Sequence, residues 1–353
     1  MVYAGAVEIQ ENIALAGYTT LGIGGPARWF VEAHNEEDVL EAVEFAHGRN
    51  LPLFVLGGGS NLLVADAGFP GLVLHLDNHG LRQEEDGQHT LFTAAAGEDW
   101  DRFVATAVEA NCAGVECLSG IPGSVGGTPV QNVGAYGQEV ASTIERVRVL
   151  DRQRTQWAEL DRAACQFAYR RSLFNTTAYG RYIVTEVTYR LLRDGGPLLA
   201  YKDLELWAKA QTQRPTLGAV RSAVRAIRRE KGMLAGMGGP DGRSAGSFFK
   251  NPVVPADQFA RLAARWPSVP HFPAEDGRVK ISAAWLMEQA GFYKGQALGA
   301  AGISTRHTLA LINRGGATTA ELLALRDTIR QRVQERFDIV LEQEPVYLSW
   351  ETT

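Results

Sequence analysis

The sequence has few cysteines, no long apolar run and no strong excess of one charge. Its three cysteines, Cys112, Cys117 and Cys165, are too few for a disulfide framework, and no histidine or second cysteine pair beside them suggests a zinc site. No apolar run reaches the roughly 18 residues of a membrane-spanning helix. The first residues, MVYAGAVEIQEN, lack the basic start and apolar core of a signal peptide. We therefore expect reduced thiols, no metal site and a soluble, cytoplasmic protein without membrane insertion.

The charge balance and composition narrow the class further. Lys and Arg total 35 against 40 Asp and Glu, a net charge of −5 that argues against broad binding to nucleic acid. Apolar residues make up 45% and charged residues 21%, which is typical of a globular protein and excludes disorder. Because single cores stop growing near roughly 250–300 residues, a chain of 353 residues predicts two or three domains.

The apolar pattern predicts a mixture of helices and strands. Asn35 is a good N-cap for a helix whose first turn is acidic, and Thr318 and Glu321 have the spacing of a capping box before an apolar stripe over 322–333. Further helices are expected at 100–110 and 217–229. Strands are expected at 28–33, 51–56, 72–76, 91–96, 145–150, 155–160, 183–191 and 339–343. These elements do not follow an even strand–helix cadence, so the predicted fold class is α+β.

Two motifs resemble functional sites but lack the context those sites require. Gly22–Ala27 fits the dinucleotide pattern G-x-G-x-x-A, but a short polar approach precedes it and a strand-like segment follows. Gly242–Gly246 fits the hydrolase pattern G-x-S-x-G, but no buried strand leads into Ser244. We therefore favour neither a Rossmann site nor a serine hydrolase, although His271 and His307 could supply a base for the latter.

Glycine is abundant, with 38 residues gathered in long irregular segments. The segments 57–61 and 113–137 both follow apolar elements and carry neither a metal set nor a nucleophile with its base. Many backbone donors and few charged side chains suit a large, flat cofactor with a pyrophosphate. By itself, Gly57–Ser60 fits an anion nest or a tight turn equally well. The stripe Arg221, Arg225 and Arg228 is interpreted as a solvated helix face rather than a phosphate site.

At these segments the sequence closely resembles the UDP-N-acetylenolpyruvoylglucosamine reductases (UDP-N-acetylmuramate dehydrogenases) of bacterial cell-wall synthesis. The resemblance extends from about Tyr18 to Tyr347. Its landmarks are LPLFVLGGGSNLLV at 51–64, IPGSVGGTPVQNVGAYGQE at 121–139, FAYRRSLF at 167–174, LAYKDL at 199–204, AGSFFKNP at 245–252 and LEQE at 341–344. The first two also resemble the wider vanillyl-alcohol-oxidase type of flavin fold.

The resemblance implies a fold and an activity. It implies an FAD-binding fold of two α+β subdomains, residues 1–77 joined by 319–353 and residues 78–230, with a substrate-binding domain at 231–318. It implies a flavoenzyme that is reduced by NADPH and reduces the enolpyruvyl ether of its UDP-sugar substrate to UDP-N-acetylmuramate. FAD is expected to be bound non-covalently, and the protein to be a monomer. Another FAD oxidoreductase of the same fold, such as an alcohol or lactone oxidase, and a non-catalytic UDP-sugar-binding protein remain the alternatives.

Three residues carry the chemistry that the resemblance implies. Arg170 matches the family's active-site arginine, and its fork suits a carboxylate on which negative charge develops. Ser247 matches the general acid that supplies a proton to the neighbouring carbon. Glu344 matches a carboxyl group beside the arginine, and we expect it to be protonated or hydrogen-bonded when charge develops on the substrate.

Binding residues carry over in the same way. The cofactor-binding residues implied are Gly57, Gly58, Gly59, Ser60, Asn61, Pro122, Gly123, Ser124, Gly126, Gly127, Gln131, Asn132, Gly134, Ala135 and Tyr136. The substrate-binding residues implied are Tyr201, Lys231, Asn251, Lys294 and His307, and Tyr201 places the chain in the subclass whose tyrosine closes over the nucleotide. One departure concerns the segment after Lys231, where a longer glycine-rich loop, 232–244, replaces the usual K-L-P-D-P.

Overall fold

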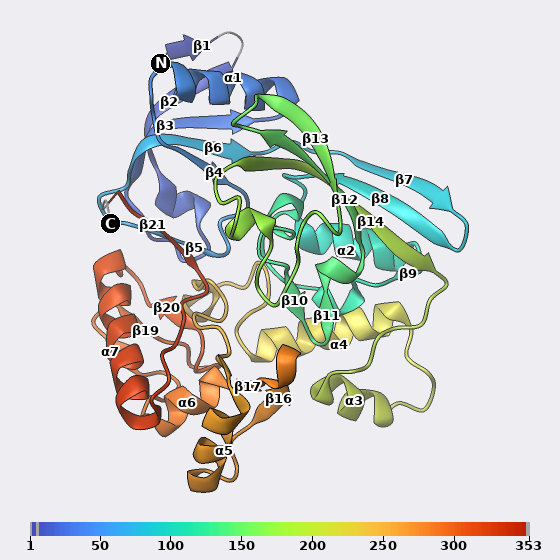
Figure 1. The fold of residues 1–353 in the computed structure, drawn as a ribbon, viewed down its shortest axis with the longest axis vertical. Coiled ribbons are helices and arrows are strands. Elements are labelled where there is room, and N and C mark those ends of the chain that lie inside the picture. Colours follow the sequence, from blue (N-terminus) through green and yellow to red (C-terminus); the bar gives the residue numbers. More distant parts are fainter. Residues whose placement is uncertain (1, 5–6, 351–353) are drawn as a thin grey trace. The chain divides into compact units, whose positions relative to one another are not determined.

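The computed structural model describes residues 2–4 and 7–350 and divides them into two compact units (Figure 1). The first unit comprises residues 1–13, 27–59 and 69–229, and the second comprises 14–26, 60–68 and 230–353. Strands and helices are mixed in both, as the predicted α+β class requires. This division groups 319–353 with 230–318, and the three-part functional division at 77, 230 and 318 stays a prediction.

The first unit contains two main sheets. The strand order of the five-stranded sheet is β1-β2-β3-β6-β4, in which β3, β6 and β4 are parallel. The larger sheet has the antiparallel order β13-β12-β14-β8-β7, with β9 also paired to β14. A separate pair, β10-β11, completes the sheets of this unit. The strands of the first unit are β1 (Val2–Ala4), β2 (Val7–Ala14), β3 (Pro26–Ala33), β4 (Leu53–Leu56), β6 (Phe69–Leu76), β7 (Leu81–Asp86), β8 (His89–Ala95), β9 (Cys112–Ala113), β10 (Gly134–Ala135), β11 (Gln138–Glu139), β12 (Ile144–Asp151), β13 (Gln156–Asp161) and β14 (Tyr182–Arg193).

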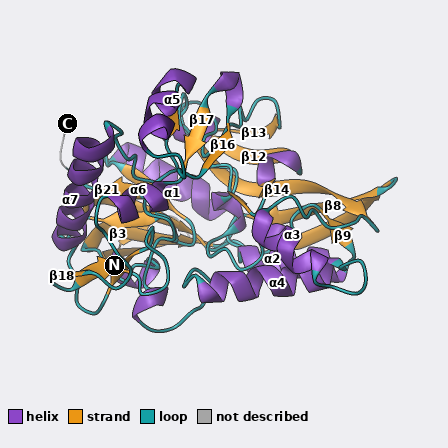
Figure 2. Cartoon of the chain, turned by 90° about the horizontal axis from the view of Figure 1, so that it is seen from below, coloured by secondary structure: helices purple, strands orange, loops and turns teal. Residues whose placement is uncertain are grey.

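Helices cover these sheets with the apolar faces that the sequence predicts. In α1 (Glu36–Gly48), the Asn35 side chain accepts a hydrogen bond from the Asp38 N–H at 2.9 Å and so caps the first turn. Its buried face packs on β3 and β6, whereas α2 (Trp100–Glu109) packs on β8, β12 and β14. The unit also contains α3 (Lys202–Lys209) and α4 (Leu217–Glu230), and α2 and α4 lie next to each other in both ribbon views (Figures 1 and 2).

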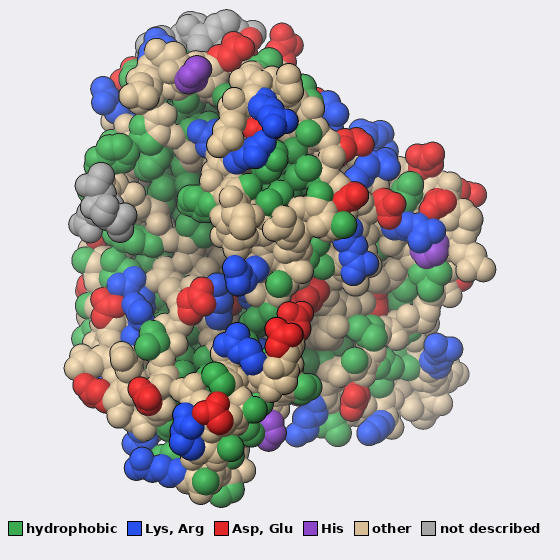
Figure 3. Space-filling view, in the orientation of Figure 1, with side chains coloured by type: hydrophobic (Ala, Val, Ile, Leu, Met, Phe, Trp, Pro, Cys, Tyr) green, Lys and Arg blue, Asp and Glu red, His purple; other side chains and the backbone are tan. Residues whose placement is uncertain are grey.

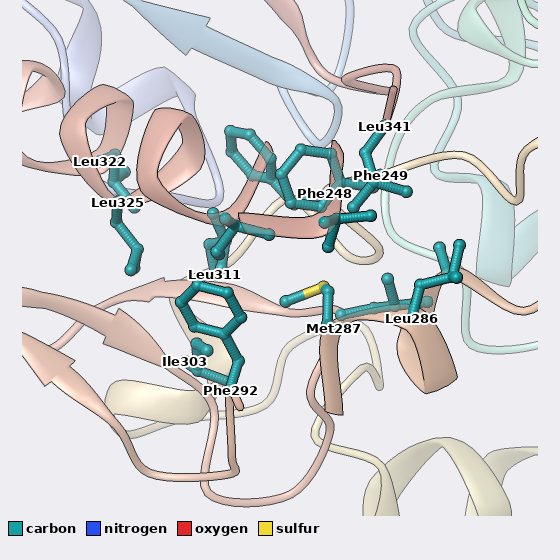
Figure 4. Close-up of a cluster of buried hydrophobic side chains, with 14 of the residues drawn as sticks. Phe248, Phe249, Leu286, Met287, Phe292, Ile303, Leu311, Leu322, Leu325 and Leu341 are labelled. Carbon is teal, nitrogen blue, oxygen red and sulfur yellow. The ribbon is translucent and has the colours of Figure 1, made fainter. Parts of the chain in front are cut away.

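The second unit is built around one apolar core. Phe248, Phe249 and Leu341 meet Leu286 of α6 and Leu325 of α7 there (Figure 4). Thr318 and Glu321 form the predicted capping box at the start of α7. The elements are β5 (Leu62–Val64), β15 (Val253–Val254), α5 (Ala256–Arg265), β16 (His271–Pro273), β17 (Val279–Ile281), α6 (Ala283–Gln289), β18 (Ala297–Leu298), β19 (Ala301–Ile303), β20 (Leu311–Asn313), α7 (Thr319–Phe337) and β21 (Val346–Leu348).

One strand prediction at the C-terminal end is wrong. Residues 339–343 form no strand, and only Gln343 makes an isolated bridge, to Phe249. The strand lies a few residues later, where β21 pairs in parallel with β5. Because Ile339 and Leu341 are buried in the core as irregular chain, their alternation reflects burial without a strand ladder.

Several absences can be stated for the described part of the chain. No helix there is long and apolar enough to cross a membrane. No group of three or more His, Cys, Asp and Glu side chains in the same residues could hold a metal ion. The three cysteines are free and buried, and burial raises the pKa of the Cys165 thiol to about 12. Charges of both signs are interspersed on the face shown in Figure 3.

Candidate functional site

The two glycine-rich segments of the first unit approach each other closely. Gly57 and Gly58 follow β4, and the Gly58 N–H donates to Oγ of Ser124 at 3.2 Å. A Cβ on Gly58 would lie 2.7 Å from the Cα of Gly123, and a Cβ on Gly57 would lie 2.6 Å from the Ser124 Oγ. Two stretches of backbone thus meet where side chains have no room. This cradle fits the flat, pyrophosphate-bearing cofactor that the glycine content predicts.

The second glycine-rich segment is also fixed to the residues that directly follow β8 of the larger sheet. The N–H groups of Val125 and Gly126 donate to the carbonyls of Glu98 and Ala96 at 2.8 and 2.9 Å. A Cβ on Gly126 would lie 2.5 Å from that of Ala96. The loop is therefore held by backbone bonds that only glycine permits at this position. The neighbouring residues predicted to bind the cofactor, Pro122, Gly127, Gln131, Gly134 and Ala135, belong to the same segment.

Two predicted cofactor residues, Asn132 and Asn61, use their side-chain amides within the protein. Asn132 is 1% exposed, and its amide donates to Glu139 and to the Ala168 carbonyl while accepting from the Ala141 N–H. Ser60 and Asn61 belong to the second unit, where the Asn61 amide donates to the Glu344 carbonyl at 3.3 Å. Their role toward the cofactor stays a prediction.

Arg170 lies in a tight turn of the first unit. Ala168 and Arg171 exchange two backbone hydrogen bonds of 3.0 Å, and Arg170 between them has a positive φ of 56°. Its guanidinium Nη2 donates to the Gly134 carbonyl at 2.8 Å. The predicted catalytic arginine thus contacts the glycine-rich segment predicted to bind the cofactor.

Tyr201 is placed against the same segment. It is the N-cap residue of α3, and its ring meets the ring of Tyr136 edge-on at 5.2 Å between centroids. The chain leading to it is anchored by Glu116, a fully buried carboxylate that accepts from the N–H of Leu198 at 2.9 Å and from Gln138 at 2.8 Å. This buried carboxyl group accepts hydrogen bonds from several donors and so fixes the base of the segment that carries Tyr201.

The arginine stripe of α4 is not the solvated face that the sequence suggested. Arg221 and Arg225 pair with Asp101 of α2, and Arg228 is 8% exposed and donates to the Gly120 carbonyl at 2.9 Å. Burial raises the pKa of Asp101, but hydrogen bonds from Arg221 and the Gly120 N–H outweigh burial and hold it below its usual range. The stripe docks α4 onto the glycine-rich segment.

In the second unit, Ser247 and Glu344 lie on adjacent segments of the chain. The Glu344 N–H donates to the carbonyl of Phe248, the residue after Ser247, at 2.9 Å. Phe248 and Phe249 are buried in the core of this unit, which fixes the backbone on which Ser247 is carried (Figure 4). Two of the three predicted catalytic residues, nearly a hundred positions apart in sequence, are therefore neighbours.

Three of the predicted substrate residues interact electrostatically in the second unit. Lys231 and Lys294 both act on His307, whose Nδ1 accepts from the Leu309 N–H at 3.1 Å. Burial, followed by the two lysines, lowers the His307 pKa to about 4 against a weaker opposing effect of Glu288. Near neutral pH the ring is neutral with its proton on Nε2. Two ammonium groups beside a neutral donor suit a diphosphate.

The unusual 232–244 loop is tied to this cluster. Asp241 accepts from Oγ of Ser304 at 2.7 Å and from the Thr305 N–H at 2.9 Å, just before His307. Gly232 has a φ of 70°, and a Cβ there would lie 3.2 Å from Arg306. Asn251, the remaining predicted substrate residue, accepts from the Ala283 N–H at the start of α6 at 2.9 Å. Its placement in the substrate site stays a prediction.

The neutral state of His307 gives a pH dependence. Between pH 6.5 and about 4, His307 binds a proton in the unfolded chain but not in the folded protein. The free energy of unfolding therefore falls as the pH falls through this window. We expect this residue to contribute a loss on the order of 3 kcal/mol at pH 4. Urea unfolding at successive pH values should show that the free energy of unfolding falls less with decreasing pH in His307→Asn than in wild type.

A matched control and a direct measurement complete this test. His47→Asn, at an exposed position on α1, should keep the wild-type pH profile. In NMR of histidine-labelled protein, the ring signal of His307 is identified as the one that is missing from the spectrum of His307→Asn. In wild type, this signal should show a neutral ring down to pH 5. Proton uptake by that ring near pH 6.5 would contradict the lowered pKa.

The structure also shows why the two misleading motifs are not sites. The segment before Gly22 is the 3₁₀ helix Leu15–Tyr18 and the segment after it is β3, the reverse of a dinucleotide-binding turn. Ser244 is 6% exposed and follows the 3₁₀ helix Pro240–Gly242, so it is not presented on a strand-to-helix elbow.

Sequence reasoning missed the residues that support the site. These are Glu116, Asn175 and Asp241, together with Arg228, which was named but wrongly assigned to a solvated face. Each holds a main-chain segment that carries predicted site residues. Asn175 alone had a local signal, because Ser172 and Asn175 have the spacing of a capping box. The others act on segments dozens of residues away.

Comparisons with known proteins define first the class and then the family. Residues 27–157 match the family described as FAD binding domain, so the first unit carries the fold of an FAD-binding flavoprotein. Residues 239–348 match the UDP-N-acetylenolpyruvoylglucosamine reductase C-terminal domain.

Similarity extends along nearly the whole chain. UDP-N-acetylenolpyruvoylglucosamine reductase of Thermobifida fusca (strain YX) is 47% identical over 349 residues, which cover 96% of this chain and 98% of that relative. The Streptomyces coelicolor reductase is 45% identical over 350 residues, covering 96% and 90%. The crystal structure of the reductase from Thermus caldophilus has a TM-score of 0.66 at 28% identity, covering 97% and 99%. The chain belongs to the UDP-N-acetylenolpyruvoylglucosamine reductase family, which confirms the resemblance seen in its motifs.

Proposed function

We propose that this protein is the FAD-containing, NADPH-dependent reductase that converts UDP-N-acetylglucosamine enolpyruvate to UDP-N-acetylmuramate in peptidoglycan precursor synthesis. The observation that carries the proposal is the match of 47% identity along 96% of the chain to a reductase of this name. The glycine cradle of the first unit supports it, because its close backbone approach suits the pyrophosphate of FAD. When bound, FAD supplies hydride transfer from NADPH to the terminal carbon of the enol ether.

The protein's own residues handle the charge and the proton. Addition of hydride to the terminal carbon places negative charge on the neighbouring carbon and its carboxylate. Arg170 is proposed to bind that carboxylate with its planar fork. Ser247 is proposed to deliver a proton from Oγ to the neighbouring carbon, which completes the lactyl ether. The Glu344 N–H donates to the carbonyl of Phe248, the residue after Ser247. The Glu344 carboxyl group is proposed to accept a hydrogen bond or carry a proton as the charge develops.

The nucleotide is proposed to be held by the lysine cluster. Lys231 and Lys294 flank the neutral His307, and the Asp241 anchor holds the segment on which His307 is carried. Tyr201 and Asn251 are proposed to complete the contacts to the nucleotide. The same residues are proposed to receive NADPH and then the substrate in alternation. We further propose that the enzyme works as a cytoplasmic monomer, which gel filtration with light scattering would test.

Stopped-flow mixing under anaerobic conditions tests the proposal. NADPH alone should bleach the visible absorbance of the oxidised flavin, and the enolpyruvyl nucleotide should then restore it. Rapid restoration by oxygen with indifference to the nucleotide would instead indicate an oxidase of the same fold. A colourless purified protein that still binds the nucleotide would indicate a binding protein.

A further inference from the structure

The backbone of Arg170 is strained. With a φ of 56° it occupies the left-handed region, which is unfavourable for a residue with a Cβ because the Cβ approaches the following carbonyl oxygen. It is the third residue of the turn closed by Ala168 and Arg171, a position that ordinarily favours glycine or asparagine when φ is positive. A strained residue persists only where its surroundings over-determine it, and such strain gathers at functional sites.

One side chain holds the main chain at the C-terminal end of this turn. The Asn175 Nδ2 donates to the Arg170 carbonyl at 3.2 Å, and its Oδ1 accepts from the Ser172 N–H at 2.9 Å. Ser172 in turn donates to the carbonyl of Val130 in the glycine-rich segment at 2.6 Å. The Asn175 amide therefore fixes the peptide that follows Arg170 relative to the segment that the Arg170 guanidinium contacts.

A second amide fixes the other end of the turn. Nδ2 of the buried Asn132 donates to the Ala168 carbonyl at 3.1 Å and to Glu139 at 3.0 Å. The Arg170 Nη2 donates to the Gly134 carbonyl, which lies between Asn132 and Glu139 in sequence. Backbone and side chain of Arg170 are thus tied to one stretch of chain, 132–139, by separate hydrogen bonds.

We propose that Asn175 is a positioning residue that holds Arg170 in the left-handed conformation and thereby aims its guanidinium at the substrate carboxylate. This inference rests on the proposed function, because it requires the role assigned there to Arg170. A capping role alone needs only the Oδ1 acceptor, which completes the capping box with Ser172. The donation from Nδ2 to the Arg170 carbonyl is an additional bond that a cap does not require.

Asn175→Asp separates the two roles, because aspartate retains the acceptor and loses the donor. We expect flavin reduction by NADPH to stay within about threefold of wild type. Flavin reoxidation by the enolpyruvyl nucleotide should slow by about 10–100-fold, because misplacing a reacting group by an ångström can cost about 10²-fold. Asn175→Ala, which introduces no charge, should show the same split between the two half-reactions in anaerobic stopped flow.

A double-mutant cycle distinguishes aiming from general destabilisation. If Asn175 acts through Arg170, Asn175→Asp should add no further loss in an Arg170→Ala background. The matched control is Asn313→Asp, because Asn313 in the second unit also bridges backbone groups, donating to the Leu21 carbonyl and accepting from the Gly315 N–H. It should lower the thermal unfolding midpoint and leave both half-reactions unchanged.

Several results would overturn the inference. Equal slowing of both half-reactions by Asn175→Asp, no slowing at all, or the same loss in the Arg170→Ala background would show that Asn175 does not aim Arg170. If Arg170→Ala is slow while Asn175→Asp is normal, only this inference fails. If Arg170→Ala itself reoxidises at the wild-type rate, the role of Arg170 in the proposed function fails and the inference falls with it.

Discussion

Ser247→Ala should leave flavin reduction by NADPH nearly intact and slow flavin reoxidation by the enolpyruvyl nucleotide by several orders of magnitude. A single general acid usually contributes roughly 10²–10⁴-fold. The expected loss exceeds that range, because the proposed mechanism assigns the proton that completes the lactyl ether to the Ser247 hydroxyl. Alanine removes only the hydroxyl, so the buried Phe248 and Phe249 should keep the local backbone in place.

The control for this substitution is Ser268→Ala, which changes an exposed serine of the same unit and should leave both half-reactions unchanged. Single-turnover stopped flow with substrate in excess measures each half-reaction separately. If Ser247→Ala slowed both half-reactions to the same extent, the serine would not be the proton donor. Incorporation of solvent deuterium into the product, at the carbon that receives the proton, would show that the variant still completes the protonation at its slower rate.

Local signals were enough to predict many of the elements that hold these residues. Asn35 and the Thr318–Glu321 pair begin α1 and α7 as predicted, since N-capping depends on atoms three residues apart. The stretch 113–137 is irregular, as its glycines predict, apart from two 3₁₀ turns and two-residue strands. α5 was overlooked although Phe259, Leu262, Ala263 and Trp266 have helical spacing on the face packed against the core.

The wrong predictions concern residues whose burial or secondary structure depends on partners distant in the sequence. The α4 arginines have the spacing of a solvated face, but Arg221 and Arg225 pair with Asp101, about 120 positions away, and Arg228 bonds the Gly120 carbonyl. Residues 339–343 alternate like a strand, but Ile339 and Leu341 are buried there without a strand ladder. Periodicity reports that a residue is buried, whereas the partner that buries it depends on tertiary structure.

The candidate site shows the same division. Arg170, Ser247 and Glu344 were identified as candidate catalytic residues through their motifs. The structure adds the contact between the two segments that carry Ser247 and Glu344. The support of Arg170 could not be predicted, because it depends on the sign of one backbone angle. No residue preference indicated that angle, since arginine is uncommon where φ is positive. Strain at a functional residue contradicts local propensity, so propensity cannot reveal it.

Arg170→Lys should also be severe, although it preserves the charge. The guanidinium donates to the Gly134 carbonyl through Nη2 and retains further N–H groups in the plane of its fork. Lysine is a compact point charge that cannot bind a carboxylate in two-point fashion while holding Gly134. We expect flavin reoxidation by the nucleotide to fall about 10²–10³-fold, the range for loss of one preorganised donor to a developing charge. Flavin reduction by NADPH should change little.

Arg171→Lys is the matched control for this prediction, because Arg171 is the next residue in the same turn and its side chain is exposed. It makes the same chemical change at the surface and should leave both half-reactions at wild-type rates. Near-normal reoxidation in Arg170→Lys would show that charge alone suffices and would remove the fork from the mechanism. If Arg171→Lys were the slow variant instead, the turn would present its second arginine to the substrate, and the strain at Arg170 would serve only the fold.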